Sequence, residues 1–216
     1  MKIRSGNSKL DEFLEGGYSG ISSIYGLPTS GKSCLSLMAV LKQLKDEKNV
    51  FFFDVKNDFN LSRLEQINGE SLQNHLDNLF VLKIKSFTHQ QKKVKDLLRI
   101  IEKKKFSLIV VDGFNFYYRT LSSSKSDLAR KMMNSQLRVL KEISERVPVI
   151  ITNDVFENFK SGIIQMAGGE IVNHWSNNII RLDVSETKHI TLKRLKPAKE
   201  GNFSYKIVEK GIESHI

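Results

Sequence analysis

Eight consecutive residues near the beginning of the chain match the pattern of glycine, four residues of any kind, glycine, lysine and serine. They are Gly26, Leu27, Pro28, Thr29, Ser30, Gly31, Lys32 and Ser33. The segment Ile21–Tyr25 before them is expected to form a strand, and apolar residues at three-residue steps from Leu35 to Leu44 predict a helix after them. A glycine-rich turn between a strand and a helix directs backbone N–H groups at phosphate oxygens. The pattern therefore predicts a phosphate-binding loop in an α/β fold.

The types of residue in this loop define what it is expected to bind. Lys32 is expected to reach the β- and γ-phosphates, and the Ser33 hydroxyl to ligate Mg²⁺. Asp112 ends a second apolar stretch, Leu108–Val111, and so is expected at the carboxyl edge of the sheet as a further magnesium ligand. An aspartate in such a position also serves as a turn former or helix cap in many proteins. We expect residues 26–34, the last being Cys34, to bind ATP with Mg²⁺.

The rest of the chain alternates between predicted strands and helices, which favours a largely parallel sheet with helices on both faces. The continuous apolar run Val50–Phe53 is typical of a strand buried on both sides. After Ile179 the pattern changes to short strands separated by turns, which predicts an antiparallel extension at the sheet edge. We expect an α/β, P-loop NTPase fold that forms a single domain over residues 1–216.

Composition narrows the class of protein further. The chain has 34 Lys and Arg against 24 Asp and Glu, a net charge of +10, which favours polyanionic partners. A lysine-rich solvated surface is the alternative reading. No apolar run approaches the roughly 18 residues of a membrane span, and the first residues lack the apolar stretch of a secretory signal. With Cys34 as its single cysteine, we expect a cytoplasmic protein without membrane association.

Several segments together make the sequence resemble the RecA/RadA recombinase superfamily, and within it the archaeal RadB family of short RadA paralogues. The resemblance covers nearly the whole chain, and its most distinctive part is Gly168-Gly169 followed by His174-Trp175-Ser176. It implies a RecA-like core without the additional N-terminal DNA-binding domain of full recombinases. It also implies a role in homologous recombination and DNA repair, with DNA, single-stranded or branched, and the RadA recombinase or other repair proteins as partners. The sequence leaves open whether the protein forms homo-oligomers.

Two positions depart from the pattern of active family members. Where they carry Asp-Thr-Glu, whose glutamate activates the attacking water, this chain has Asp54-Val55-Lys56. A lysine is a poor base near neutral pH, although Asp54 or Asp58 are candidate substitutes. Where the family places a glutamine that senses the γ-phosphate, this chain has Asp154, which needs a cation beside it. Lys56 is a candidate for that cation, and we expect ATP binding with weak or absent hydrolysis.

The resemblance also implies where DNA binds, since RecA cores contact DNA through two loops. The first is expected to follow residues 115–119 and to run through residues 122–125, and the second to span Phe156 to Gly168. Aromatic residues beside Arg and Lys suit stacked bases and a phosphate backbone, but core aromatics and solvated lysines explain the same pattern. A basic group near the C-terminus, with Glu200 as its one acid, is expected to bind DNA or a neighbouring subunit's ATP; a solvated strand edge is the alternative. The expected DNA contacts are Arg119, Lys125, Arg130, Lys160, Lys193, Arg194 and Lys196.

Two other functions remain open from the sequence alone. One is an active DNA-dependent ATPase or strand-exchange protein. The other is a KaiC-like regulatory ATPase of the same fold that has no DNA role. The lysine at position 56 favours an accessory protein over an active enzyme.

Overall fold

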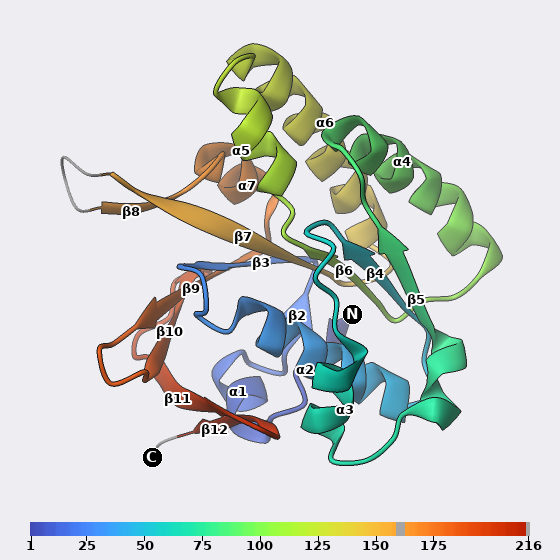
Figure 1. Ribbon diagram of the computed structural model, residues 1–216, viewed down its shortest axis with the longest axis vertical. Helices are drawn as coiled ribbons and strands as arrows, with labels where there is room; N and C mark the ends of the chain where they lie inside the picture. The colour runs from blue at the N-terminus through green and yellow to red at the C-terminus, as the bar shows by residue number, and fades with distance from the viewer. Residues whose placement is uncertain (159–162, 215–216) are drawn as a thin grey trace.

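The protein is described here by a computed structural model, which covers residues 1–158 and 163–214. Within them the chain forms a ten-stranded sheet in which β12, β11, β10, β9, β3, β7, β6, β4 and β5 follow one another, with β8 paired to β7 (Figure 1). A separate hairpin joins β1 (Lys2–Ile3) and β2 (Tyr18–Ser19). The strands of the large sheet are β3 (Ile21–Gly26), β4 (Val50–Asp54), β5 (Leu79–Lys83), β6 (Leu108–Asp112), β7 (Val149–Asn158), β8 (Ile163–Met166), β9 (Asn178–Val184), β10 (Ile190–Lys196), β11 (Phe203–Val208) and β12 (Gly211–Ser214).

Strand directions divide this sheet into two parts. From β9 through β3, β7, β6 and β4 to β5, every neighbouring pair is parallel. The strands β9, β10, β11 and β12 pair antiparallel in chain order. This arrangement confirms the predicted parallel sheet and its C-terminal antiparallel extension.

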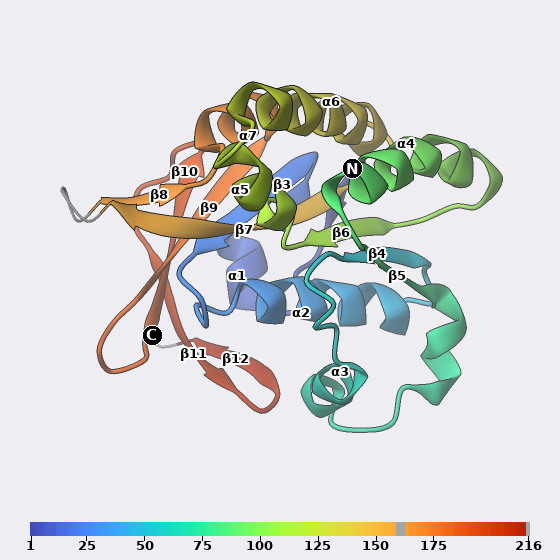
Figure 2. The same cartoon turned by 45° about the horizontal axis from the view of Figure 1, so that its top comes forward.

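Helices cover both faces of the sheet (Figure 2). The helices α4, α6 and α7 lie on one face, and α1, α2 and α3 lie on the other. Within the described residues the helices are α1 (Ser8–Phe13), α2 (Lys32–Lys45), α3 (Leu61–Asn68), α4 (Phe87–Lys103), α5 (Phe116–Ser122), α6 (Ser126–Ser144) and α7 (Gly169–Trp175), with a 3₁₀ helix at Gln73–Asn78. None of these helices combines the length and the apolar character needed to cross a bilayer.

The apolar strand β4 shows why the sheet is covered on both sides. Val50 and Phe52 pack in the core beneath α2, whereas Phe51 and Phe53 pack in the core beneath α4 and α6. Because successive side chains of a strand point to opposite faces, a continuous apolar run requires a helical layer on each face. The prediction made from this run is confirmed.

The first expected DNA-binding loop falls at the junction of α5 and α6, where residues 123–125 lie outside both helices, whereas the second expected loop contains the end of β7 and all of β8, so the prediction of a loop was wrong there. Residues 116–122 form α5, because Tyr118 is buried and packs edge-on against Phe87 at a centroid distance of 6.5 Å. In the second segment β7 continues to Asn158 and pairs antiparallel with β8. This pairing gives the backbone N–H and C=O groups of both strands hydrogen-bond partners. Lys160 lies outside the described residues.

Candidate nucleotide-binding site

The loop after β3 has the geometry that its glycines predicted. Gly31 has φ of +87°, and a Cβ there would lie 2.8 Å from Ile207 Cδ1. A Cβ at Gly26 would lie 2.6 Å from the carbonyl oxygen of Leu182. A side chain at either position would therefore force the loop or its neighbours to move. The helix α2 begins at Lys32, so its positive N-terminal end and its free N–H groups face the same space as the loop.

This space is a cleft of about 820 Å³, a volume within the range of small-molecule sites. Its walls come from the glycine-rich loop, from the segment after β4 and from the turn between β11 and β12. The lining residues are Pro28, Thr29, Gly31, Lys32, Ser33, Cys34, Leu37, Lys56, Asp58, Arg63, Ile207, Val208 and Glu209.

The C-terminal hairpin is held to the cleft by Arg63, whose contribution to this wall the sequence did not reveal. The Arg63 guanidinium donates to the carbonyl oxygens of Val208 and Glu209, each at 3.0 Å. The Cys34 thiol lies 3.8 Å from Arg63 Nη2 and 3.7 Å from the carbonyl oxygen of Gly211, the first residue of β12. These partners are far apart in the chain, so no local sequence signal could have paired them.

Asp112 is the residue that the sequence predicts as a magnesium ligand. It is buried at the end of β6, and the Thr152 hydroxyl donates a hydrogen bond to its Oδ1. Burial raises the pKa of Asp112 above its ordinary value, while hydrogen bonds from Thr152 and Ser33 act in the opposite direction. A cation bound between Ser33 and Asp112 would favour the ionised carboxylate and relieve this cost. The donors at this point therefore fit Mg²⁺ carried with a nucleotide.

Asp154, at the predicted sensor position, lies between two lysines. Lys56 Nζ is 2.9 Å from Asp154 Oδ2 and 3.1 Å from Oδ1, and Lys32 Nζ is 3.5 Å from Oδ1. Burial alone would raise the pKa of Asp154, but the hydrogen bond and charge of Lys56, assisted by Lys32, hold it below its ordinary value. Burial lowers the pKa of Lys32, partly opposed by Asp154. The ion pair between Lys56 and Asp154 that the sequence suggested is present.

The two aspartates considered as substitutes for the missing glutamate occupy different environments. Asp54 is buried, and its Oδ1 accepts a hydrogen bond from the backbone N–H of Asp58 at 3.0 Å. That contact shapes the turn after β4. Asp58 is exposed and lines the cleft. Of the two, Asp58 has the better access to the cleft.

Three of the predicted DNA-binding residues lie on the α5–α6 corner. Arg119 is exposed on α5, and Lys125 and Arg130 are exposed at the beginning of α6. Arg130 Nη2 lies 3.7 Å from Glu170 Oε2, and a hollow of about 550 Å³ joins this corner to β8 and α7. The corner and the base of the β7–β8 hairpin are thus neighbours.

The basic group near the C-terminus does not form the single surface that the sequence suggested. Neighbouring residues on β10 point to opposite sides of the sheet. Lys193 pairs with Asp183 at 3.3 Å, and Lys196 donates to the carbonyl oxygen of Asn173 at 2.7 Å. Arg194 is buried and pairs with Glu15 at 3.0 Å, so its assignment as an exposed DNA contact was wrong.

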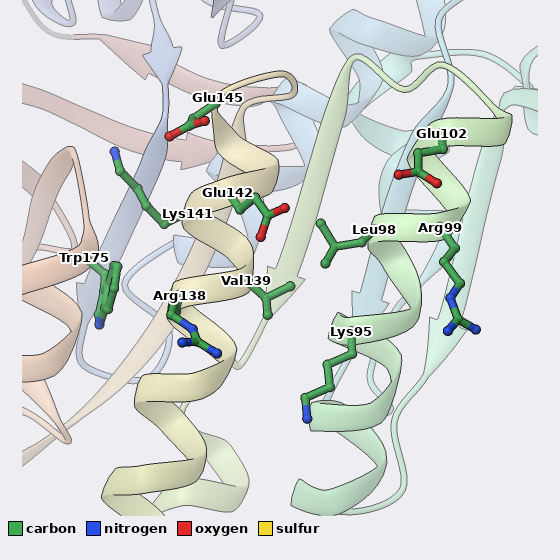
Figure 3. A pocket seen from close by; sticks show the side chains of 10 residues that line it. All are labelled: Lys95, Leu98, Arg99, Glu102, Arg138, Val139, Lys141, Glu142, Glu145 and Trp175. Atoms are coloured by element: carbon green, nitrogen blue, oxygen red, sulfur yellow. The ribbon is translucent and has the colours of Figure 1, made fainter.

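A second hollow, of about 910 Å³, lies between α4 and α6 on the opposite side of the sheet from α2 (Figure 3). Basic side chains such as Lys95 and Arg138 line it together with acidic ones such as Glu102 and Glu142. It is remote from the glycine-rich loop and from Asp112, so the smaller cleft is the candidate nucleotide site.

The glycine-rich loop after β3, the acid at the end of β6 and the parallel sheet define a P-loop protein of the RecA type. The family model described as Rad51 matches residues 1–215. The "DNA repair and recombination protein RadB" of Methanobrevibacter smithii is 32% identical over 219 residues, covering 95% of this chain and 93% of that protein. The RadB protein of Archaeoglobus fulgidus is 30% identical, covering 99% and 98% of the two chains. The chain belongs to the Rad51 family and, within it, to the archaeal RadB proteins.

Proposed function

We propose that this protein binds ATP with Mg²⁺ in the cleft and acts as a DNA-binding accessory protein of homologous recombination and repair, with weak or absent hydrolysis. The proposal treats residues 1–216 as one RecA-like core. The observation that carries it is the ion pair of Lys56 with Asp154 at 2.9 Å, beside an otherwise intact phosphate loop.

The loop residues each have a part in holding the nucleotide. The backbone N–H groups of residues 26–34, Pro28 excepted, would surround the phosphates, and Lys32 would leave the loop carbonyls of Gly26 and Leu27 to bind the β- and γ-phosphates. Ser33 and Asp112 would hold Mg²⁺, which neutralises phosphate charge when bound. The lining that Arg63 and the C-terminal hairpin provide would lie beside the rest of the nucleotide.

Weak hydrolysis follows from the groups available to activate water. A lysine ammonium that donates to a carboxylate has no free lone pair to accept a proton. Asp54 is buried and engaged with the backbone of Asp58. The absence of a well-placed carboxylate at position 56 would remove a contribution of about 10²–10⁴ in rate, the usual range for a general base.

A DNA-binding role is supported by charge and by family membership. The relatives named above are called DNA repair and recombination proteins. The α5–α6 corner presents Arg119, Lys125 and Arg130 beside the base of the β7–β8 hairpin, and the chain carries a net charge of +10. Lysines and arginines on one corner attract a phosphate backbone and release its counterions.

The test combines nucleotide and DNA measurements on one preparation. ATP affinity and hydrolysis are measured with and without single-stranded and branched DNA, and DNA affinity is measured over a range of salt concentrations. We expect ATP binding, salt-sensitive DNA binding and no stimulated turnover. Arg119→Ala is expected to weaken DNA binding and lower the salt slope by about one, while the exposed Lys45→Ala, at the far end of α2, leaves both unchanged.

The alternative functions predict other results in the same experiment. Asp58, exposed at the cleft, favours an active DNA-dependent ATPase or strand-exchange protein as second candidate, and strong DNA-stimulated turnover would support it. Absence of salt-sensitive DNA binding would contradict both and favour a regulatory ATPase. A role through partners is tested by measuring binding to the RadA recombinase, and self-association by sedimentation with and without ATP.

A further inference from the structure

Lys56 reaches the nucleotide cleft along a path that a glycine leaves open. A Cβ at Gly113 would lie 2.8 Å from Lys56 Cγ and 2.9 Å from Cε, and Gly113 has φ of +80°. The aliphatic part of Lys56 therefore packs over bare backbone, directly after the magnesium-site residue Asp112. This packing fixes the direction of the side chain and carries its ammonium group towards the phosphate loop.

At the end of that path, two ammonium groups share one anionic oxygen. Asp154 Oδ1 lies 3.1 Å from Lys56 Nζ and 3.5 Å from Lys32 Nζ. Lys32 is the loop lysine, whose place is beside the β- and γ-phosphates. The oxygen that both lysines contact is thus adjacent to the place where the end of a triphosphate lies. The two lysines carry one positive charge more than Asp154 carries negative charge, and the Asp112 carboxylate, the predicted magnesium ligand, also acts on both lysines.

We propose that the Lys56 ammonium binds the γ-phosphate of ATP, and that the Asp154 carboxylate occupies this place when no nucleotide is bound. The proposal rests on the ATP binding proposed above and adds what the substituted lysine does. The oxygens of a γ-phosphate would accept charge-assisted hydrogen bonds from Lys56. The β-phosphate of ADP would instead be bound by Lys32 and the loop, without a contact to Lys56. Lys56 therefore makes the cleft selective for a triphosphate over a diphosphate.

Asp154 gives this selectivity a second component. Its carboxylate must give up part of its contact with the lysines when the γ-phosphate arrives, because like charges repel at this distance. Its backbone stays in place, since the Asn115 side chain accepts from the Asp154 N–H at 2.9 Å and donates to its carbonyl oxygen at 2.8 Å. The exchange thus needs only rotation of side chains, and Asp154 acts as a competitor of the γ-phosphate.

The experiment measures the equilibrium affinities of ADP and of the β,γ-imido analogue of ATP, which resists hydrolysis, in the presence of Mg²⁺. Lys56→Met removes the charge and keeps an unbranched stem over Gly113. We expect it to weaken binding of the analogue by roughly ten- to a hundredfold, the value of one charged hydrogen bond, and to change ADP affinity by less than about twofold. Lys56→Arg is expected to retain most of the preference, and Asp154→Asn to tighten binding of the analogue. Lys45→Met, at the distant end of α2, is the matched control.

The outcomes separate this inference from the proposed function. If the unmodified protein binds neither nucleotide, the proposed function fails. If it binds both with equal affinity, or if Lys56→Met weakens both equally, the nucleotide site stands and the role of Lys56 is refuted. Weaker binding of the analogue by Asp154→Asn would refute the competition between that carboxylate and the γ-phosphate.

Discussion

The ion pair between Lys56 and Asp154 makes a prediction about the stability of the nucleotide-free protein. The Lys56 and Asp154 side chains are 24% and 11% exposed, so solvent weakens their attraction only in part. A hydrogen bond to a charged group contributes about 1.5–3 kcal/mol. Lys32 remains near Asp154 when Lys56 is replaced, and the repulsion between the two lysines disappears, so the lower part of that range applies. We expect Lys56→Met to reduce the free energy of unfolding by about 1–2 kcal/mol.

For a domain of this size that loss corresponds to a Tm lower by roughly 2–8 °C. Thermal and urea unfolding of the original protein, both single variants and the double variant with Asp154→Asn give the coupling energy of the pair. Because the pKa of Asp154 is lowered in the folded state, its contribution is fully present above the ordinary value of 3.8 and is lost as the pH falls below it. The effect of Lys56→Met is thus expected to be constant from about pH 5 to 7 and to shrink below about pH 4. A coupling energy of zero at pH 7 would refute the electrostatic reasoning.

Three further predictions concern the same cleft. Lys56→Glu combined with Asp154→Gln, which restores the residues of active family members, is expected to raise steady-state ATP hydrolysis at least about tenfold; an unchanged rate would show that the lysine does not limit it. Asp112→Asn is expected to abolish the effect of Mg²⁺ on ATP affinity, measured by calorimetry with and without chelator. Burial raises the pKa of Asp112, so its ionised carboxylate destabilises the folded protein above about pH 4. Asp112→Asn removes this cost and is expected to raise the Tm of the nucleotide-free protein in that pH range. Gly31→Ala is expected to lower the Tm and abolish ATP binding, since its Cβ would meet Ile207 at 2.8 Å, whereas wild-type affinity would contradict the loop geometry.

The parts of this protein that could be predicted from sequence are those set by local pattern. The run Val50–Phe53 required a strand covered on both faces, and the glycines at 26 and 31 required a tight turn. The positions of Ser33 and Asp112 at the same edge followed from strand direction alone, because the carboxyl ends of parallel strands meet there.

What sequence could not predict depends on contacts between distant segments. Arg63 holds the C-terminal hairpin to the cleft across 145 residues, and nothing near Arg63 indicates that partner. Arg194 is buried because Glu15, at the other end of the chain, pairs with it, whereas the neighbouring sequence showed only a basic cluster. Similarly, Tyr118 of α5 is buried against Phe87 of α4, and no local pattern indicates that contact.

We propose that ATP binds in the cleft and is hydrolysed there slowly or not at all. A single-turnover experiment tests it most directly, with labelled ATP bound to excess protein in the presence of Mg²⁺ and single-stranded DNA. We expect the nucleotide to be bound and to be recovered almost entirely as ATP over many minutes. Conversion of the bound ATP to ADP at the rate of an active recombinase measured alongside would contradict it.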